Sequence, residues 1–219
     1  MLRQRHLVAE GLGTGLLVMA VVGSGIMAEQ LSQDVGVQLL ANAVATGGAL
    51  FALITIFAPL SGASFNPIVT IVGELLERKR SVASVVGDIV VQCCGAAVGA
   101  VLANAMFARA AFETSEKIRT GGPRWLSEVV ATMGLLLVIW GGKHAKANVA
   151  LLVAGWITGA YWFTSSTSIA NPAVGFGRMF SNSFAGIAPE SWPMFTLMQI
   201  IGGVVGFLVI RLLFVGEDQ

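Results

Sequence analysis

The sequence predicts an all-α membrane protein with six membrane-spanning helices and two short re-entrant half-helices, arranged as an inverted repeat. Of its 219 residues, 55% are hydrophobic and only 11% are charged, whereas soluble domains carry about 25% charged residues. The mean hydropathy is +0.80, and six apolar runs approach the roughly 20 residues that a bilayer span requires. This composition excludes a water-soluble enzyme and a disordered chain, and the net charge of +1 excludes a strongly basic nucleic-acid binder.

The expected spans follow one another along the whole chain. The first begins directly after Arg3, Arg5 and His6, as the apolar part of a signal peptide does. It is too long for a signal peptide, however, it contains Glu10, and no small-residue cleavage site follows it. We therefore interpret it as the first of six spans. They cover residues 7–28, 39–60, 82–106, 125–142, 147–163 and 192–211.

Two further apolar segments are too short to cross a bilayer and contain a proline. Segment 61–77 is interrupted by Pro67, and segment 166–181 by Pro172. Short, proline-interrupted segments at corresponding places in two halves of a chain indicate a transport site built from half-helices. In each segment an asparagine precedes the proline, and Asn is a strong helix N-cap while Pro suits the first helical position. Each Asn-Pro pair should therefore begin a short helix.

The two halves of the chain repeat the same order of features. The first span carries Glu10 with Thr14, and the fourth carries Glu128 with Thr132. Three spans separate the two copies, and an odd number of crossings makes the repeat inverted. The first repeat covers about 1–107 and the second about 125–215. An outside loop, 108–124, joins them within a single domain that occupies 1–219.

Glu10 and Glu128 have two interpretations. Each could be a proton or ion site of a coupled secondary transporter, because an ionisable residue inside a span is costly and often functional. Alternatively, each could anchor irregular backbone at membrane depth, whose polar groups find no partner in lipid. The equivalent positions of the two carboxylates beside two broken segments favour structural buried carboxylates.

The two half-helices should meet near the middle of the membrane. In an inverted repeat they enter from opposite faces, so both positive dipole ends point at one spot, where the asparagine amides supply hydrogen-bond donors. Such a spot accepts a neutral hydroxyl-bearing solute and repels a cation, including a proton.

These motifs resemble those of the major intrinsic protein family, the aquaporins and aquaglyceroporins. The resemblance rests on AEGLGTGLLV at 9–18, SGASFNPIVT at 61–70 and IANPAVGFGR at 169–178, and it extends over essentially the whole chain. It implies six tilted helices and two half-helices around one pore per subunit, in a homotetramer. The first pore motif departs from the family's usual Asn-Pro-Ala. The two motifs are Asn66, Pro67 and Ile68, and Asn171, Pro172 and Ala173.

The resemblance also implies where the outer constriction lies. The family usually has an arginine directly after the second motif, and this chain has Val174 there. Counting back without gaps places the rest of the selectivity filter at Thr46, Gly159 and Ser168. Water-selective members usually present a bulky aromatic residue, a histidine and the arginine, so this neutral set predicts a wider ring. Arg178, four residues beyond Val174, is a candidate for the vestibule or, alternatively, faces solvent or lipid headgroups.

A wide, neutral ring predicts a passive channel for small neutral solutes. Valine in place of arginine resembles aquaglyceroporins associated with bacterial arsenic resistance, which implies glycerol-like polyols, arsenous acid, methylated arsenicals and water as solutes. A water-selective aquaporin and a coupled transporter using Glu10 or Glu128 are the alternatives. No nucleophile-and-base constellation, metal motif or nucleotide motif is present, so we expect no enzyme, no cofactor and no metal site.

Basic residues predict the orientation in the membrane. A start on the inner side places eight basic residues inside and five outside, which favours cytoplasmic N- and C-termini in a bacterial inner membrane. The inner set is Arg3, Arg5, Arg78, Lys79, Arg80, Lys143, Lys146 and Arg211, and the outer set is Arg109, Lys117, Arg119, Arg124 and Arg178. The expected partners are the lipid bilayer and the solutes, with no nucleic acid.

Overall fold

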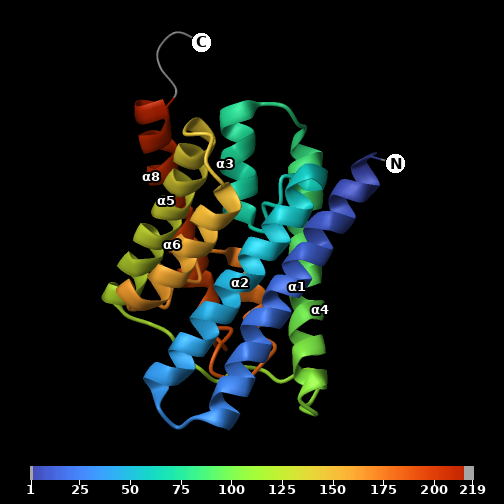
Figure 1. Cartoon of the computed structure of the whole chain (residues 1–219), viewed down its shortest axis with the longest axis vertical. Coiled ribbons are helices and arrows are strands. Elements are labelled where there is room, and N and C mark those ends of the chain that lie inside the picture. The colour runs from blue at the N-terminus through green and yellow to red at the C-terminus, as the bar shows by residue number, and fades with distance from the viewer. Residues whose placement is uncertain (1, 215–219) are drawn as a thin grey trace.

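The computed structural model describes residues 2–214, which form eight α-helices and no strand. Figure 1 shows them in the colours of the chain. They are α1 (Leu2–Leu31), α2 (Val35–Ser61), α3 (Pro67–Glu77), α4 (Val82–Met106), α5 (Gly122–His144), α6 (Val149–Phe163), α7 (Pro172–Arg178) and α8 (Trp192–Phe214). The all-α prediction of six spans and two half-helices is confirmed.

Five of these helices are long and apolar enough to cross a membrane, and α6 is a shorter apolar helix of 15 residues. At 1.5 Å per residue, α6 covers about 22 Å, which is less than the roughly 30 Å of a hydrocarbon core. The non-helical stretch that follows α6 continues through the molecule to α7. The first span starts earlier than expected, because the helical pattern continues through the basic turn at 2–6.

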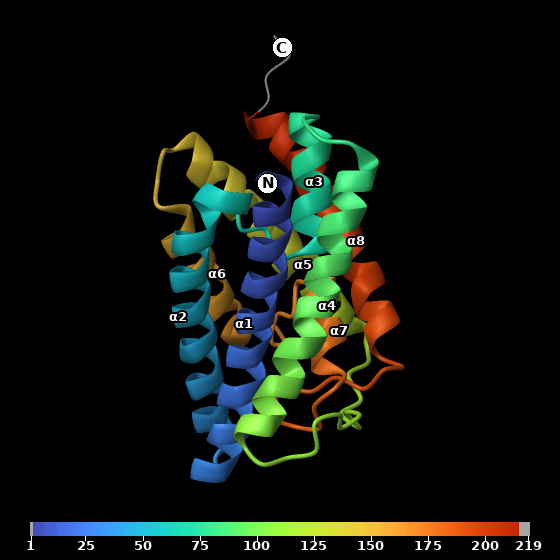
Figure 2. The same cartoon turned by 90° about the vertical axis from the view of Figure 1, so that its right-hand side faces the viewer.

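The helices pack as two equivalent halves. In the first half α1 packs against α2 and α4, and in the second α5 packs in the same way against α6 and α8. Figure 2 shows α3 at the end of the molecule where α1 begins and α8 ends, and α7 toward the opposite end. The two half-helices therefore enter the bundle from opposite ends, as an inverted repeat requires. The endpoint that we expected for the second repeat, residue 215, lies outside the described residues.

Small residues allow α1 and α4 to pack backbone to backbone. A Cβ atom added to Gly95 would lie 2.0 Å from the carbonyl oxygen of Gly11, and one added to Gly99 would lie 2.1 Å from that of Gly15. Lipid supplies no hydrophobic force between helices, so close packing of this kind holds them together.

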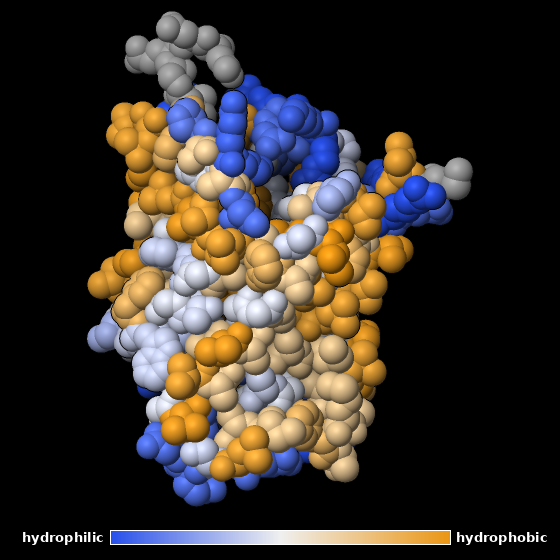
Figure 3. All heavy atoms as spheres, viewed as in Figure 1, coloured by the Kyte–Doolittle hydropathy of each residue, from blue (hydrophilic) through white to orange (hydrophobic). Residues whose placement is uncertain are grey.

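The outer surface carries the apolar side chains that a lipid environment accepts. Leu12, Val44, Leu102 and Leu208 are each about half exposed or more. Figure 3 shows hydrophobic residues over the middle of the molecule and hydrophilic residues gathered at its two ends. This banding is the pattern of a protein whose middle lies in hydrocarbon.

Candidate functional site

The two asparagines of the Asn-Pro pairs lie together in the interior of the bundle. Asn66 Nδ2 donates to the carbonyl oxygen of Ala170 at 2.8 Å, and Asn171 Nδ2 donates to that of Phe65 at 2.7 Å. Each amide thus binds the backbone of the other half. The first residues of α3 and α7 are therefore brought to one place, with both positive helix ends directed at it.

Each asparagine also caps its own half-helix. Asn66 Oδ1 accepts from the backbone N–H of Ile68 at 2.9 Å. Asn171 Oδ1 accepts from Ala173 at 3.0 Å and from Val174 at 3.2 Å. Because the Oδ1 atoms face the helix and the Nδ2 atoms face the opposite backbone, both amide planes are fixed.

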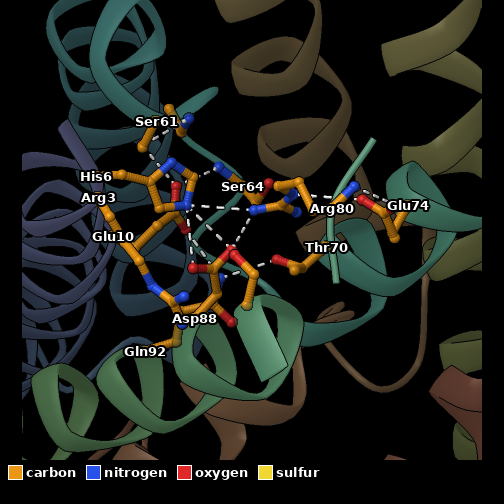
Figure 4. A network of polar contacts seen from close by, with 12 residues as sticks. Arg3, His6, Glu10, Ser61, Ser64, Thr70, Glu74, Arg80, Asp88 and Gln92 are labelled. Carbon is orange, nitrogen blue, oxygen red and sulfur yellow. Dashed lines mark hydrogen bonds and ion pairs between the residues drawn. The ribbon is translucent and has the colours of Figure 1, made fainter. Parts of the chain in front are cut away.

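The carboxylate of Glu10 holds the chain that leads into α3. It accepts hydrogen bonds from the backbone N–H groups of Ser64 at 3.0 Å and Phe65 at 2.8 Å. The side chains of Ser61 and Gln92 add bonds of 2.6 Å and 2.8 Å. Figure 4 shows Ser61, Ser64 and Gln92 around Glu10. With four donors and 1% exposure, this carboxylate is satisfied within the protein.

Glu128 does the same for the chain that leads into α7. It accepts from the backbone N–H groups of Ile169 at 3.0 Å and Ala170 at 2.8 Å, and from Gln199 Nε2 at 2.6 Å. Neither Glu10 nor Glu128 lines the central cavity. The geometry therefore favours the structural anchor over a coupled ion site.

The anchored backbone is strained in the same way in both halves. Phe65 has φ 48° and Ala170 has φ 49°, in the left-handed region that L-residues rarely adopt. Both N–H groups are held by the carboxylates just described. Our reading of the sequence missed the supporting Gln92 and Gln199. Their signal is a glutamine in the middle of the last span of each half, where an uncharged polar side chain needs a partner.

A cavity of about 450 Å³ runs past the two asparagines. Residues from both halves line it, as the repeat predicts. They include six of the expected site residues, namely Asn66, Asn171, Thr46, Ser168, Val174 and Arg178. The structure thus brings the pore asparagines and three of the four expected filter residues to one cavity.

Gly159 is the exception, because it is not among the residues that line the cavity. The face of α6 that lines the cavity carries Val153, Ile157 and Tyr161, which are spaced by four residues. Gly159 lies two residues from Tyr161, which turns it about 200° around the helix. A Cβ atom on Gly159 would meet Phe163, in its own helix, at 3.6 Å.

Tyr161, which we did not expect at the site, lies on the face of α6 that lines the cavity. Its hydroxyl lies 3.1 Å from the hydroxyl of Thr46, and its side chain is buried. Ser168 contributes a further hydroxyl, which is buried and has no hydrogen-bond partner within the described residues. Val174 supplies the apolar side. These four cavity-lining side chains are therefore neutral, with three hydroxyl groups and one aliphatic side chain.

Ile68, the departure from the usual motif, does not line the cavity. It is buried and packs against α8, where a Cβ atom on Gly203 would lie 2.7 Å from Ile68 Cγ2. A glycine on α8 thus makes room for the larger side chain. In the second motif, Ala173 is buried and the carbonyl oxygen of Pro172 accepts from Trp192 Nε1 at 3.0 Å.

Arg178 lines the cavity at the end of α7. It is only 2% exposed, and its Nε donates to the carbonyl oxygen of Ala185. It therefore faces neither bulk solvent nor lipid headgroups. Within residues 2–214, no group of three His, Cys, Asp or Glu side chains could hold a metal ion.

Residues 1–161 match the family model described as Major intrinsic protein. The chain belongs to this family. Membership makes it a multi-pass membrane channel through which water or other small solutes pass passively, and not an enzyme. The match ends before the second Asn-Pro pair, so the hydrogen bonds of Asn66 to Ala170 and of Asn171 to Phe65 are evidence for the second half that is independent of it.

Individual relatives cover nearly the whole chain. Aquaglyceroporin AqpS from Rhizobium meliloti (strain 1021) is 48% identical over 210 residues, which are 94% of this chain and 89% of that protein. Aquaporin Z from Bradyrhizobium diazoefficiens is 29% identical, over 93% of this chain and 90% of its own. The crystallographic aquaglyceroporin from Plasmodium falciparum has the same fold, with a TM-score of 0.76, 19% identity and 97% of each chain covered.

Proposed function

We propose that this member of the major intrinsic protein family is a channel for small neutral solutes larger than water, as well as for water itself. The solutes that we expect are glycerol-like polyols, arsenous acid and methylated arsenicals. The observation that carries the proposal is Val174, which lines the cavity at the position where the family usually has a guanidinium group. Selectivity in such pores depends on diameter, lining hydrogen bonds and electrostatic barriers, and valine changes all three.

The other constriction residues that line the cavity, together with Val174, suit a solute that has both hydroxyl groups and an apolar carbon surface. The unpartnered hydroxyl of Ser168 and the paired hydroxyls of Thr46 and Tyr161 offer hydrogen bonds. Val174 offers an apolar surface opposite the hydrogen-bonding groups that a polyol requires. The name aquaglyceroporin, borne by the relative from Rhizobium meliloti at 48% identity, supports the same solute class.

One observation favours the alternative of a water-selective aquaporin. Tyr161, rather than Gly159, lines the cavity, and an aromatic ring narrows the passage more than a glycine would. Water selectivity would then depend on Tyr161 and not on a charged filter. The experiment below separates these two functions.

We also propose the setting of the channel. The chain would form a homotetramer in a bacterial inner membrane, with both termini cytoplasmic. The start of α1 and the end of α8 lie at the same end of the molecule (Figure 1), and the basic residues at that end favour the inner side. Arg178 would then stand in the outer vestibule, one turn of α7 beyond Val174.

Stopped-flow light scattering on proteoliposomes tests the proposed function. Water, glycerol and arsenous acid are compared on the wild type, Val174→Arg and Val174→Leu. We expect Val174→Arg to lose glycerol and arsenous acid flux by about tenfold or more while it retains water flux. Val174→Leu adds volume without charge and should reduce these fluxes less. A wild type that passes water alone would establish the water-selective alternative.

A further inference from the structure

Three cationic side chains converge on one short segment at the α7 end of the cavity. They come from the segment before α5 and from the end of α7, and they donate to the carbonyl oxygens of three consecutive residues, 184–186. The bonds are Lys117 Nζ to Phe184 at 2.9 Å, Arg119 Nη2 to Phe184 at 3.2 Å, Arg119 Nε to Gly186 at 2.9 Å, and Arg178 Nε to Ala185. We call these three residues the outer cation cluster.

The charge of the outer cation cluster is not neutralised by an ion pair. Within residues 2–214, no carboxylate oxygen lies within 4.0 Å of any of its three side chains. Carbonyl oxygens satisfy their hydrogen bonds but carry no net charge. Only Arg178 of the three lines the cavity, so its charge is the one that lies nearest to a passing solute.

The cations at the other end of the cavity are different, because each has a carboxylate partner within 3.4 Å. Figure 4 shows Arg80 directed at Asp88 and Glu74. The pairs are Arg80 with Glu74, Lys79 with Glu77 and Lys143 with Glu77. The unpaired charge along the cavity is therefore concentrated at the α7 end.

The members of the cluster are close enough to affect one another. Burial, followed by the charge of Arg178, lowers the pKa of Arg119 to about 9. Burial, followed by the charge of Arg119, lowers the pKa of Lys117 to about 8, although Glu29 acts in the opposite direction. Burial is the larger cause of both shifts, and Glu128 opposes the shift of Arg119, but the contribution of each cation to a neighbour's pKa shows that the three charges act on the same region of space.

We propose that Arg178, supported by Arg119 and Lys117, is the barrier to cations in this channel and replaces the charge that is missing at Val174. The proposal rests on the proposed function, since it concerns the same pore. Placing the charge one turn beyond the ring leaves the ring itself neutral. Arg119 Nη1 also reaches the Ser166 carbonyl and the Thr167 hydroxyl, each at 3.4 Å, which places its charge beside the segment that carries Ser168.

Sodium uptake into proteoliposomes, driven by a diffusion potential, tests the proposal on the full-length chain. We expect Arg178→Gln to raise sodium permeability by about tenfold or more, because one unit charge in a low-dielectric pore presents a large barrier. Arg119→Gln should raise it less. Arg124→Gln is the matched control, since Arg124 is exposed, does not line the cavity and is the weakest of the charges that act on Arg119; its sodium permeability should stay close to that of the wild type.

Water flux measured on the same vesicles shows that each variant is folded and open. Sodium permeability unchanged from the wild type in an open Arg178→Gln channel would overturn the proposal. The sodium comparison also stands apart from the proposed function. If the wild type passes water but no glycerol, the proposed solute class is wrong. The sodium permeabilities of the wild type and Arg178→Gln would still show whether Arg178 is the cation barrier.

Titration of the wild type tests the cluster without altering Arg178. Lys117 is charged below its pKa of about 8 and neutral above it. The groups that face it are Arg119, Arg178, Glu29 and the ring of Phe184, 4.7 Å from Nζ. Sodium leak should therefore rise as the outer pH passes from 7 to 8, a range in which Arg119, with its pKa of about 9, is still mostly charged; Lys117→Arg, which stays charged, should suppress that rise. A leak that is flat with pH in the wild type would contradict a contribution from Lys117.

Discussion

The hydroxyl of Tyr161 lies 3.1 Å from the hydroxyl of Thr46, and this contact joins α6 to α2 beside the cavity. Tyr161 is the single tyrosine of the chain. It places an aromatic ring and a polar group at the constriction, while Val174 removes the customary charge. The size and the chemistry of the opening are therefore set by different residues, which can be tested separately.

Removing only the hydroxyl tests the chemistry. In Tyr161→Phe the ring keeps its width, but the constriction loses one hydrogen-bonding group and Thr46 loses its partner. We expect glycerol permeability to fall several-fold relative to water, since a polyol replaces its hydration at these hydroxyls. Tyr161→Ala should instead raise glycerol flux. The measurement is the ratio of glycerol to water permeability. An equal ratio in Tyr161→Phe and the wild type would show that the width of the constriction alone determines its selectivity for glycerol.

Converting a buried carboxylate to an amide tests the anchor. In Glu128→Gln, an NH2 group replaces one oxygen that accepts from a backbone N–H and from Gln199, so a buried donor loses its partner at a cost of about 1–3 kcal/mol. We expect a lower melting temperature in detergent. The solute flux that remains should not respond to an imposed proton or sodium gradient.

Glu190→Gln provides the comparison for this variant. Glu190 is an exposed carboxylate of the same half, and its substitution should leave the melting temperature unchanged. A Glu128→Gln protein with wild-type stability and flux that no longer follows an ion gradient would restore the coupled transporter.

The fold could be predicted from the sequence because lipid restricts it so strongly. Span lengths follow from hydrophobic thickness, and Asn-Pro pairs define helix starts through capping and through the missing N–H of proline. The positions of Asn66, Asn171 and Val174 along the cavity follow from those helix starts. These positions are counted along short, regular helical segments, so an error of a residue or two in a predicted helix start moves them only slightly.

Irregular backbone limited the prediction of the site. Tyr161 lines the cavity and was not expected there, because the extended chain between α6 and α7 has no periodicity from which the cavity-facing side of α6 could be counted. The outer cation cluster was equally hidden. It forms through the carbonyl oxygens of residues 184–186. Every residue type carries such a main-chain acceptor, so the sequence does not indicate which carbonyl oxygens accept from a cation.

The crossing of α1 and α4 predicts a steric limit. Gly95→Ala would place a methyl carbon 2.0 Å from the carbonyl oxygen of Gly11, and a backbone atom cannot rotate away as the end of a flexible side chain could. We expect little folded protein by size-exclusion chromatography. Gly48→Ala is the control, since nothing lies within 4 Å of an added Cβ there. Equal yields for both variants would show that the helices separate more easily than the packing indicates.

The contact between Ile68 and Gly203 predicts a compensating pair. Gly203→Ala places a methyl carbon 2.7 Å from Ile68 Cγ2, and overpacking of a filled site costs about 1–3 kcal/mol. Ile68→Ala alone leaves a void beside α8. The double variant should recover stability beyond the sum of the two single effects, because the alanine on α8 occupies space that the isoleucine has left. Thermal unfolding of the four proteins in one detergent measures this coupling. If the stability losses of the two single variants were strictly additive in the double variant, Ile68 and Gly203 would not be energetically coupled.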